Sequence, residues 1–361
     1  HIGSVGAFED AHYDGAAASL TQSLQNGALH QDGKPAYYIY RQTYNGPDGR
    51  ERSRTGFFGA VRLEDPRAGG AIRPHERTLK GPKEDRLKLM AATHANVSPI
   101  FALFQDSTGV VAQLFSRVQS APPASTFTDD KGIRHTYWIV SDPADTQHIT
   151  AALQNQNLYI ADGHHRYETA LGFSTQSKDP GATHILMYLV DIADPGLAVF
   201  PIHRVATLTD AQQHSLLQRV DSLFLRSPLG GSTQIEDALE KATHPCLAVS
   251  GKIFGGSYLL QPRSHALLDF FKTKEVPAAL AALDVTALHT GLLDDFGISY
   301  GTGLSFIHST QEALAVAQKD PSTVAFLLPR PSVHQMIDVV TAGLTMPQKS
   351  TFFYPKPATG I

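Results

Sequence analysis

Residues 158–170 read LYIADGHHRYETA and form the most informative stretch of the chain. A short apolar run ends at Asp162 and Gly163 and passes directly into a segment with helical spacing. Glycine permits a sharp turn and lets a ligand approach the backbone closely. The stretch therefore predicts a buried strand, a tight turn at Gly163 and a helix that begins beside it.

Alternation of apolar and polar residues predicts strands on both sides of this stretch. Residues 36–44 and 54–63 alternate around the turn sequence NGPDG, which is typical of a β-hairpin. Further strands are expected at 98–106, 135–141, 184–192 and 198–206, and helices at 5–30, 84–97 and 142–156. We expect a long loop at 66–83 and a surface linker at 117–132. Strands and helices mixed in this way favour an α+β fold with a mixed sheet.

The pattern changes after about residue 207, which suggests three regions. Residues 1–68 form an N-terminal helix and hairpin region, and residues 69–206 form a phosphate-binding core. Residues 207–361 form a C-terminal α/β region whose Lys-containing tail packs on the core. The chain begins with His rather than Met, so we expect the first region to be truncated at its start.

Composition excludes several classes of protein. Hydrophobic residues make up 42% of the 361 residues, so a sizeable core can form. A formal net charge of -4 argues against a generic nucleic-acid partner. The one cysteine, Cys246, excludes an internal disulfide and fits a reducing cytoplasm. No apolar run approaches the roughly 18 residues of a membrane span, so we expect no membrane partner. The composition leaves a homo-oligomer open.

The turn after Asp162 has the chemistry of an anion site. The first N–H groups of a helix lack partners, and its dipole adds partial positive charge there. His164, His165 and Arg166 fall in that first turn, where cations are unfavourable unless an anion, above all phosphate, is bound. Asp162 stands beside them and can accept a proton or hold Mg²⁺.

Two other interpretations of this turn stay open. In the first, Asp162 caps the helix, Gly163 only forms the turn, and the histidines face solvent. In the second, the turn binds a transition metal, because His164 and Glu168 share a helix face. His165 points away from that face, however, and the metal would need further ligands.

A second cluster of charge lies in the Pro- and Gly-containing segment before the helix expected at 84–97. Its six basic residues suit a polyphosphate; they are Arg73, Arg77, Lys80, Lys83, Arg86 and Lys88. Glu76 lies between His75 and Arg77 and is a candidate base or metal ligand. A solvated loop with surface ion pairs is the alternative.

Three further places carry polar residues that suit a small substrate: the end of an apolar strand, a tight loop near the C-terminus and a helix-to-strand junction. The candidate substrate-binding residues are His203, Arg204, Lys349, Ser350, Thr351 and Asn96. Each place also has a structural alternative. His203 can be a structural histidine, the loop around Lys349 can be a structural turn, and Asn96 can cap a helix. No Walker A, G-x-S-x-G or H-E-x-x-H motif is present.

Blocks of sequence along the chain resemble the DUF1015 family of bacterial and archaeal proteins. These blocks are IRPHERTLKGPKEDRLKLMAATHANVSPIF (72–101), LYIADGHHRYETA (158–170), FPIHRV (200–205), LDVTALH (283–289) and MPQKSTFFYPK (346–356). They occur in the order expected for the family. Members of the family usually begin with a further segment that carries a Pro-Tyr-Asp-like motif, which this chain lacks.

The order of glutamate, helix, apolar strand and D-G-H-H-R also resembles the ParB/sulfiredoxin-like fold, and within it the free-serine kinase group. The resemblance implies that Gly163, His164, His165 and Arg166 cradle nucleotide phosphates. It implies that Asp162 is the acidic residue needed for phosphoryl transfer and that Glu76 matches an upstream catalytic glutamate. The further phosphate- or nucleotide-binding candidates are His75, Arg77, Lys83 and Arg86. The resemblance also points to serine metabolism.

These observations favour a phosphotransferase acting on a small hydroxyl substrate, with free L-serine or O-phosphoserine as the expected compound. The donor is a nucleotide (ATP or ADP) or pyrophosphate, and Mg²⁺ is expected to bridge its phosphates, with Asp162 as a further ligand. One alternative is a phosphatase or nucleotide hydrolase that uses the same site with water. Another is a ParB-like, nucleotide-binding regulatory or DNA-binding protein, which the net charge disfavours.

Overall fold

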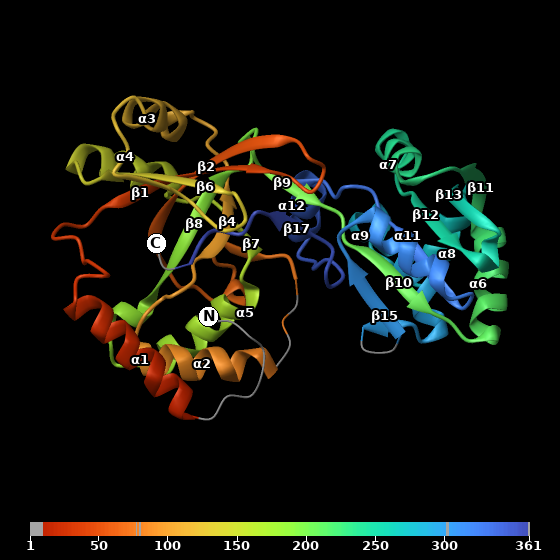
Figure 1. The fold of residues 1–361 in the computed structure, drawn as a ribbon, viewed down its shortest axis with the longest axis horizontal. Helices are drawn as coiled ribbons and strands as arrows, with labels where there is room; N and C mark the ends of the chain where they lie inside the picture. Colours follow the sequence, from red (N-terminus) through yellow and green to blue (C-terminus); the bar gives the residue numbers. More distant parts are fainter. Residues whose placement is uncertain (1–9, 77, 79–80, 301–302, 360–361) are drawn as a thin grey trace. The chain divides into compact units, whose positions relative to one another are not determined.

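The computed structural model describes residues 10–76, 78, 81–300 and 303–359. The chain forms two compact units (Figure 1). The first contains the residues up to Ala198 together with the C-terminal tail from Phe353, and the second contains Val199–Phe352. The tail, which we expected to pack on the core, thus belongs to the same unit as the D-G-H-H-R motif.

The first unit is built on an eight-stranded sheet. In spatial order its strands are β3 (Ile72–Pro74), β7 (Leu158–Asp162), β4 (Ile100–Phe104), β8 (His184–Asp191), β2 (Glu51–Arg62), β1 (Tyr37–Asn45), β6 (Arg134–Val140) and β5 (Ser125–Thr128). The pairs β3–β7 and β4–β8 are parallel and the other pairs are antiparallel. The hairpin β1–β2 and the mixed-sheet α+β fold class predicted from sequence are confirmed.

Helices and the C-terminal tail cover opposite faces of this sheet. The helices of the unit are α1 (Asp10–Gln25), α2 (Gly81–Thr93), α3 (Val110–Val118), α4 (Pro143–Leu153) and α5 (His164–Gln176). Ile39 and its neighbours on one face pack with apolar residues of α3, α4 and α5. Side chains alternate across a strand, so Tyr40 lies on the other face, where its ring contacts Phe58 and Tyr188. Phe353 of the tail packs on this second face against Phe101.

Three sequence expectations need correction. The segment 66–83, expected as a loop, contains β3 and the start of α2, together with a 3₁₀ turn at Pro66–Ala68. The expected linker 117–132 contains the end of α3 and the edge strand β5. The single strand expected at 198–206 is two strands, β9 (Ala198–Phe200) and β10 (His203–Thr207). Pro201 lies between them, and proline lacks the N–H that a continuous strand needs.

The second unit has a seven-stranded sheet in the order β11 (Phe224–Leu229), β13 (Gly256–Pro262), β12 (Leu247–Gly251), β16 (Thr323–Leu327), β10, β15 (Gly303–Ile307), β14 (Ser299–Tyr300). Its helices are α6 (Asp210–Leu223), α7 (Ser232–Lys241), α8 (Ala266–Thr273), α9 (Ala278–Ala281), α10 (Asp284–Leu288), α11 (Thr310–Lys319) and α12 (Val333–Thr341). Apolar residues of α7 and α11 pack against β12 and β16 in one core that includes Cys246. Strand β17 (Phe352–Tyr354) carries the chain back toward the first unit.

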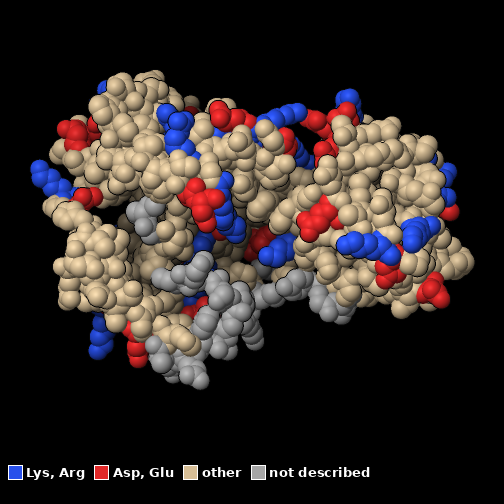
Figure 2. Space-filling view, in the orientation of Figure 1, with Lys and Arg blue, Asp and Glu red and all other residues tan. Residues whose placement is uncertain are grey.

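The surface carries charges of both signs. On the face drawn in Figure 2, Lys and Arg side chains are interspersed with Asp and Glu side chains. Among the described residues, no helix combines the length and apolar character needed to cross a bilayer.

Candidate functional site

The end of strand β7 positions the central carboxylate of the site. Ile160 and Ala161 are buried in the sheet, and Asp162 is the last residue of the strand. Gly163 follows with φ 102°, a left-handed conformation that residues with a side chain rarely adopt. A Cβ atom on Gly163 would lie 2.8 Å from Arg166 Nη2 and 2.9 Å from Ile100 Cδ1. Both the backbone conformation and the crowding therefore require glycine here.

Helix α5 begins immediately after this turn, as the sequence predicts. Gly163 is its N-cap and makes no side-chain capping hydrogen bond. The first turn of the helix carries His164, His165 and Arg166. Basic side chains beside the positive end of a helix favour the binding of an anion.

Asp162 lies between two cations. Its Oδ2 accepts a hydrogen bond of 2.8 Å from Arg166 Nη2, and its Oδ1 accepts one of 2.6 Å from Lys356 Nζ. Burial by itself raises the pKa of this carboxyl, but the charges of Lys356 and Arg166 outweigh burial and hold the pKa below its ordinary value. Asp162 is therefore ionised at neutral pH.

Lys356 is a site residue that the sequence analysis did not single out. It is the last residue of the family block 346–356, from which Lys349, Ser350 and Thr351 were predicted as site residues. The sequence signal for this residue is a lysine between two prolines, Pro355 and Pro357, directly after a run of aromatic residues. Its contact with Asp162 spans 194 residues of sequence and is visible only in the folded chain.

A buried arginine anchors the tail that carries Lys356. Arg54 is fully buried and donates hydrogen bonds to the backbone oxygens of Tyr354 and Pro355 and to the side chain of Gln42. Gln42 in turn donates to the backbone oxygen of Lys356 at 3.1 Å. These bonds fix the backbone on both sides of Pro355, so they set where the Lys356 side chain starts.

Arg166 links Asp162 to a small pocket. The pocket has a volume of about 30 Å³ and is lined by Arg86, Asn96, Ser98 and Arg166 among others. Three of these residues, Arg86, Asn96 and Arg166, were candidates from sequence, and the fold brings them together. The volume suits a small polar group.

Arg166 also has an unused donor. Its Nε is buried and makes no hydrogen bond with any described residue. This atom lies over the turn, because a Cβ on Gly163 would be 3.0 Å away from it. Burial without an acceptor is costly for a guanidinium N–H, and an anion bound at the turn would supply the acceptor.

His75 and His164 are two buried histidines that contact each other beside the turn. The His75 backbone N–H donates to His164 Nε2 at 3.2 Å, and His75 Nδ1 donates to the Ile160 carbonyl at 2.7 Å. Burial lowers the pKa of His75 to about 4 and that of His164 well below its ordinary value, so both rings are neutral. Their hydrogen bonds join the end of β3 to β7 and to the start of α5. A direct role of the two histidines in phosphate binding stays a prediction.

The rest of the basic segment is only partly described. Glu76 follows His75 and is half-buried. The predicted ligand Arg77, together with Lys80, lies outside the described residues, and the Lys83 side chain is likewise outside them. His165 is half-buried on the first turn of α5, and its backbone oxygen accepts from Thr169.

Five candidate substrate residues lie in the second unit. His203 is buried between the Leu328 N–H and Thr310 Oγ1, at 3.2 Å from each. Arg204 is fully buried and donates to backbone oxygens, including that of Lys349 at 2.9 Å. Lys349 is exposed, Ser350 is buried and Thr351 is half-buried. These contacts give His203 and Arg204 structural roles within the unit, and substrate binding by the five stays a prediction.

The residues around Asp162 fit a phosphate better than a directly bound Mg²⁺. Arg166, Lys356 and the first turn of α5 provide positive charge, and the buried Arg166 Nε lacks an acceptor. Both oxygens of Asp162 already accept from cations. A divalent ion at Asp162 would have to displace them, so this geometry does not support Asp162 as an Mg²⁺ ligand.

Fold and site together define a mixed-sheet α+β protein with a cationic, glycine-containing turn around an ionised carboxylate. The chain belongs to the DUF1015 family, because the model of that family, described as a protein of unknown function, matches residues 5–286. The family membership predicted from the sequence blocks is thereby confirmed. No curated protein matches the chain.

Several solved structures are similar to this chain at low identity. A free serine kinase variant in complex with ADP is 14% identical with a TM-score of 0.43, over 82% of this chain and 87% of that chain. SbnI with a C-terminal truncation, from Staphylococcus aureus, is 12% identical with a TM-score of 0.44, over 84% and 85%. A conserved hypothetical protein from Pyrococcus furiosus is 15% identical with a TM-score of 0.38, over 82% and 90%.

Proposed function

We propose that this protein is a phosphotransferase that acts on a small hydroxyl compound and takes the phosphoryl group from a nucleotide or pyrophosphate. The observation that carries the proposal is the position of Asp162, an ionised carboxylate held between Arg166 and Lys356 at the start of a helix. Phosphoryl transfer depends mainly on positioning and on neutralising phosphate charge. A carboxylate held between two cations can meet both requirements.

Asp162 is proposed to orient the acceptor hydroxyl and to receive its proton. As the hydroxyl oxygen bonds to phosphorus, the bond from phosphorus to the leaving oxygen breaks, and the leaving group keeps the electron pair. Arg166 and Lys356 neutralise the phosphate oxygens together with the N–H groups of α5. Phosphate entering the turn draws Lys356 away from Asp162, and this frees Oδ1 for the hydroxyl. Glu76 remains the second candidate for the base.

The carboxylate group of the small acceptor is proposed to bind in the pocket lined by Arg86, Asn96 and Arg166. Two guanidinium groups and an amide suit the carboxylate and polar groups of an amino acid. Free L-serine or O-phosphoserine is the first candidate, because the D-G-H-H-R motif resembles that of the free-serine kinase group. The proposal includes both phosphoryl transfer to serine and the reverse reaction from O-phosphoserine.

A mass-spectrometric assay tests this function. The purified full chain is incubated with Mg²⁺, L-serine and, in separate reactions, ATP, ADP or pyrophosphate, and O-phosphoserine is measured. Product is expected with one donor, and Asp162→Asn is expected to abolish it. Asp145→Asn is the matched control, since Asp145 of α4 forms an ion pair with Arg117 of α3 and takes no part in the turn. Undiminished turnover in Asp162→Asn would exclude the proposed role of this carboxylate.

A further inference from the structure

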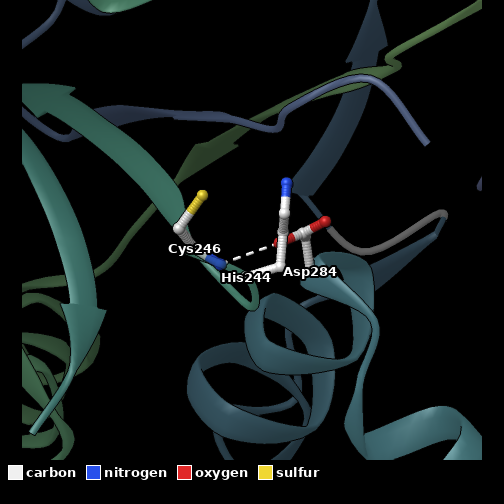
Figure 3. Close-up of side chains that lie close together, drawn as sticks. All are labelled: His244, Cys246 and Asp284. Atoms are coloured by element: carbon white, nitrogen blue, oxygen red, sulfur yellow. Dashed lines mark hydrogen bonds and ion pairs between the residues drawn. The ribbon is translucent and has the colours of Figure 1, made fainter. Parts of the chain in front are cut away.

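The second unit contains a group of metal-binding side chains that the proposed reaction does not use. His244 and Cys246 lie in the segment that leads into β12, and Asp284 is the first residue of α10. One ligand atom from each residue lies within 4.8 Å of the others. Figure 3 draws the three side chains together. We propose that His244, Cys246 and Asp284 form a binding site for a divalent transition-metal ion of the zinc class.

The donor set selects this class of ion. Thiolate and imidazole are preferred by zinc and similar borderline ions, whereas Mg²⁺ and Ca²⁺ prefer sites made of oxygen alone. Three protein ligands leave one position of a tetrahedral ion for water or a small anion. A distance of 4.8 Å is longer than the separation of ligand atoms around one zinc ion, so a rotation of the Cys246 or His244 side chain is expected on binding.

Hydrogen bonds hold the carboxylate in place beside the other two ligands. Asp284 Oδ1 accepts from the Cys246 backbone N–H at 2.7 Å and lies 2.9 Å from His244 Nδ1. Both contacts involve Oδ1, which leaves Oδ2 as the expected ligand atom. The same bonds tie the segment 244–246 to α10, so the two backbone segments are held together before an ion arrives and only side chains have to rotate.

Two acidic side chains lie side by side in this group, and both are buried: Cys246 and Asp284. A bound dication would compensate both, because a metal ion stabilises a thiolate and a carboxylate directly.

The site is accessible from solvent. The His244 side chain is 40% exposed, although Cys246 and Asp284 are buried. Asp284 also lines a pocket of the second unit together with Ile202 and Met346. An ion can therefore enter beside His244.

Titration of the full chain with Co²⁺ tests the proposal. A cobalt–thiolate bond gives a charge-transfer absorption in the near ultraviolet, and any such band must arise from Cys246, the one cysteine of the chain. We expect one Co²⁺ per chain, displacement by Zn²⁺, and affinity at least about tenfold weaker in His244→Ala and in Asp284→Asn. His265→Ala, which changes another exposed histidine of the second unit, should bind as the parent does.

Three results would overturn the proposal: no thiolate band at saturating Co²⁺, a band of unchanged affinity in both variants, or one metal ion per two chains. In the first case Cys246 is only a core residue, and in the third it bridges two molecules. Asp284 is buried, so its variant is checked for folding by circular dichroism. His244 is exposed, and its variant decides the question if Asp284→Asn does not fold.

Discussion

The ammonium group of Lys356 lies 2.6 Å from Oδ1 of Asp162, although 194 residues separate the two in sequence. Asp162 ends an interior strand of the first sheet, and Lys356 lies in the tail that packs on one face of that sheet. The tail is therefore part of the candidate site and supplies one of the two described cations that contact Asp162. The predictions below follow from this contact and from the residues that maintain it.

Replacing Lys356 by Met should raise the pKa of Asp162, because one of the two charges that lower it is removed. Carbon-13 NMR of the carboxyl groups as a function of pH measures this directly and needs no substrate. If the proposed function holds, kcat/KM should also fall by about a hundredfold, the typical cost of losing one stabilising donor. Lys178→Met, an exposed lysine after α5, should change neither quantity. An unchanged Asp162 titration would mean that the ion pair does not form in solution.

Replacing Arg54 by Met should release the tail and weaken the first unit. The change leaves the Gln42 side chain and the carbonyls of Tyr354 and Pro355 without their buried donor. We expect a loss of about 2–4 kcal/mol in the free energy of unfolding. Urea unfolding followed by tryptophan fluorescence measures it, since the single tryptophan, Trp138, lies in the first unit.

The control for Arg54→Met is Arg50→Met in the turn before β2. Arg50 is exposed, and substitutions of exposed residues usually change stability by less than about 0.5 kcal/mol. Arg54→Met should also raise the Asp162 pKa in the same direction as Lys356→Met, because both variants remove Lys356 from the site. Equal stability of the two arginine variants would contradict the anchoring role of Arg54.

Replacing Gly163 by Ala should destabilise the first unit and impair phosphate binding. The left-handed backbone costs about 1–2 kcal/mol for a residue with a Cβ, and this Cβ would press on Arg166 and Ile100. Gly109→Ala is the matched control, because Gly109 is also a left-handed N-cap but has open space around it. Urea unfolding should show a larger loss for Gly163→Ala than for Gly109→Ala. Calorimetry with inorganic phosphate or pyrophosphate should show weaker binding only in the former.

The buried histidines make the stability of the first unit depend on pH. Burial lowers the pKa of His75 in the folded protein to about 4, below its ordinary value of 6.5. Between these values the unfolded chain binds a proton that the folded chain excludes, so stability falls as pH falls from about 6.5 toward 4. At pH 5 this amounts to about 2 kcal/mol for His75, and His164 adds to it in the same direction.

Replacing His75 by Asn should reduce this pH dependence while keeping a donor near the Nδ1 position. The free energy of unfolding, measured from Trp138 fluorescence at pH 7 and pH 5, should differ less in the variant than in the parent. His148→Asn, an exposed histidine of α4, should keep the parent's difference. If His75→Asn also kept the full difference, His75 would not be the neutral, buried group described above.

Sequence patterns predicted the elements whose signals are local. The β1–β2 hairpin and the strand–turn–helix around Gly163 were predicted because alternation, a turn sequence and a glycine lie within a few residues of each other. Strand β5 was missed because its residues are mostly exposed and give no apolar alternation. Its edge position follows from pairing with β6 alone, which no short stretch of sequence encodes.

The sequence by itself determined that Asp162, Gly163 and Arg166 share one turn, because a strand that runs directly into a helix fixes neighbouring residues within one helical turn. It also showed a separate cluster of basic residues at 73–88. Only the tertiary structure decided that Arg86 and Asn96 border Arg166 in one pocket, that Lys356 reaches Asp162, and that Arg54 holds the tail. These contacts join segments that sequence leaves far apart. They depend on strand order and on which sheet face the tail covers, and packing of the whole unit determines both.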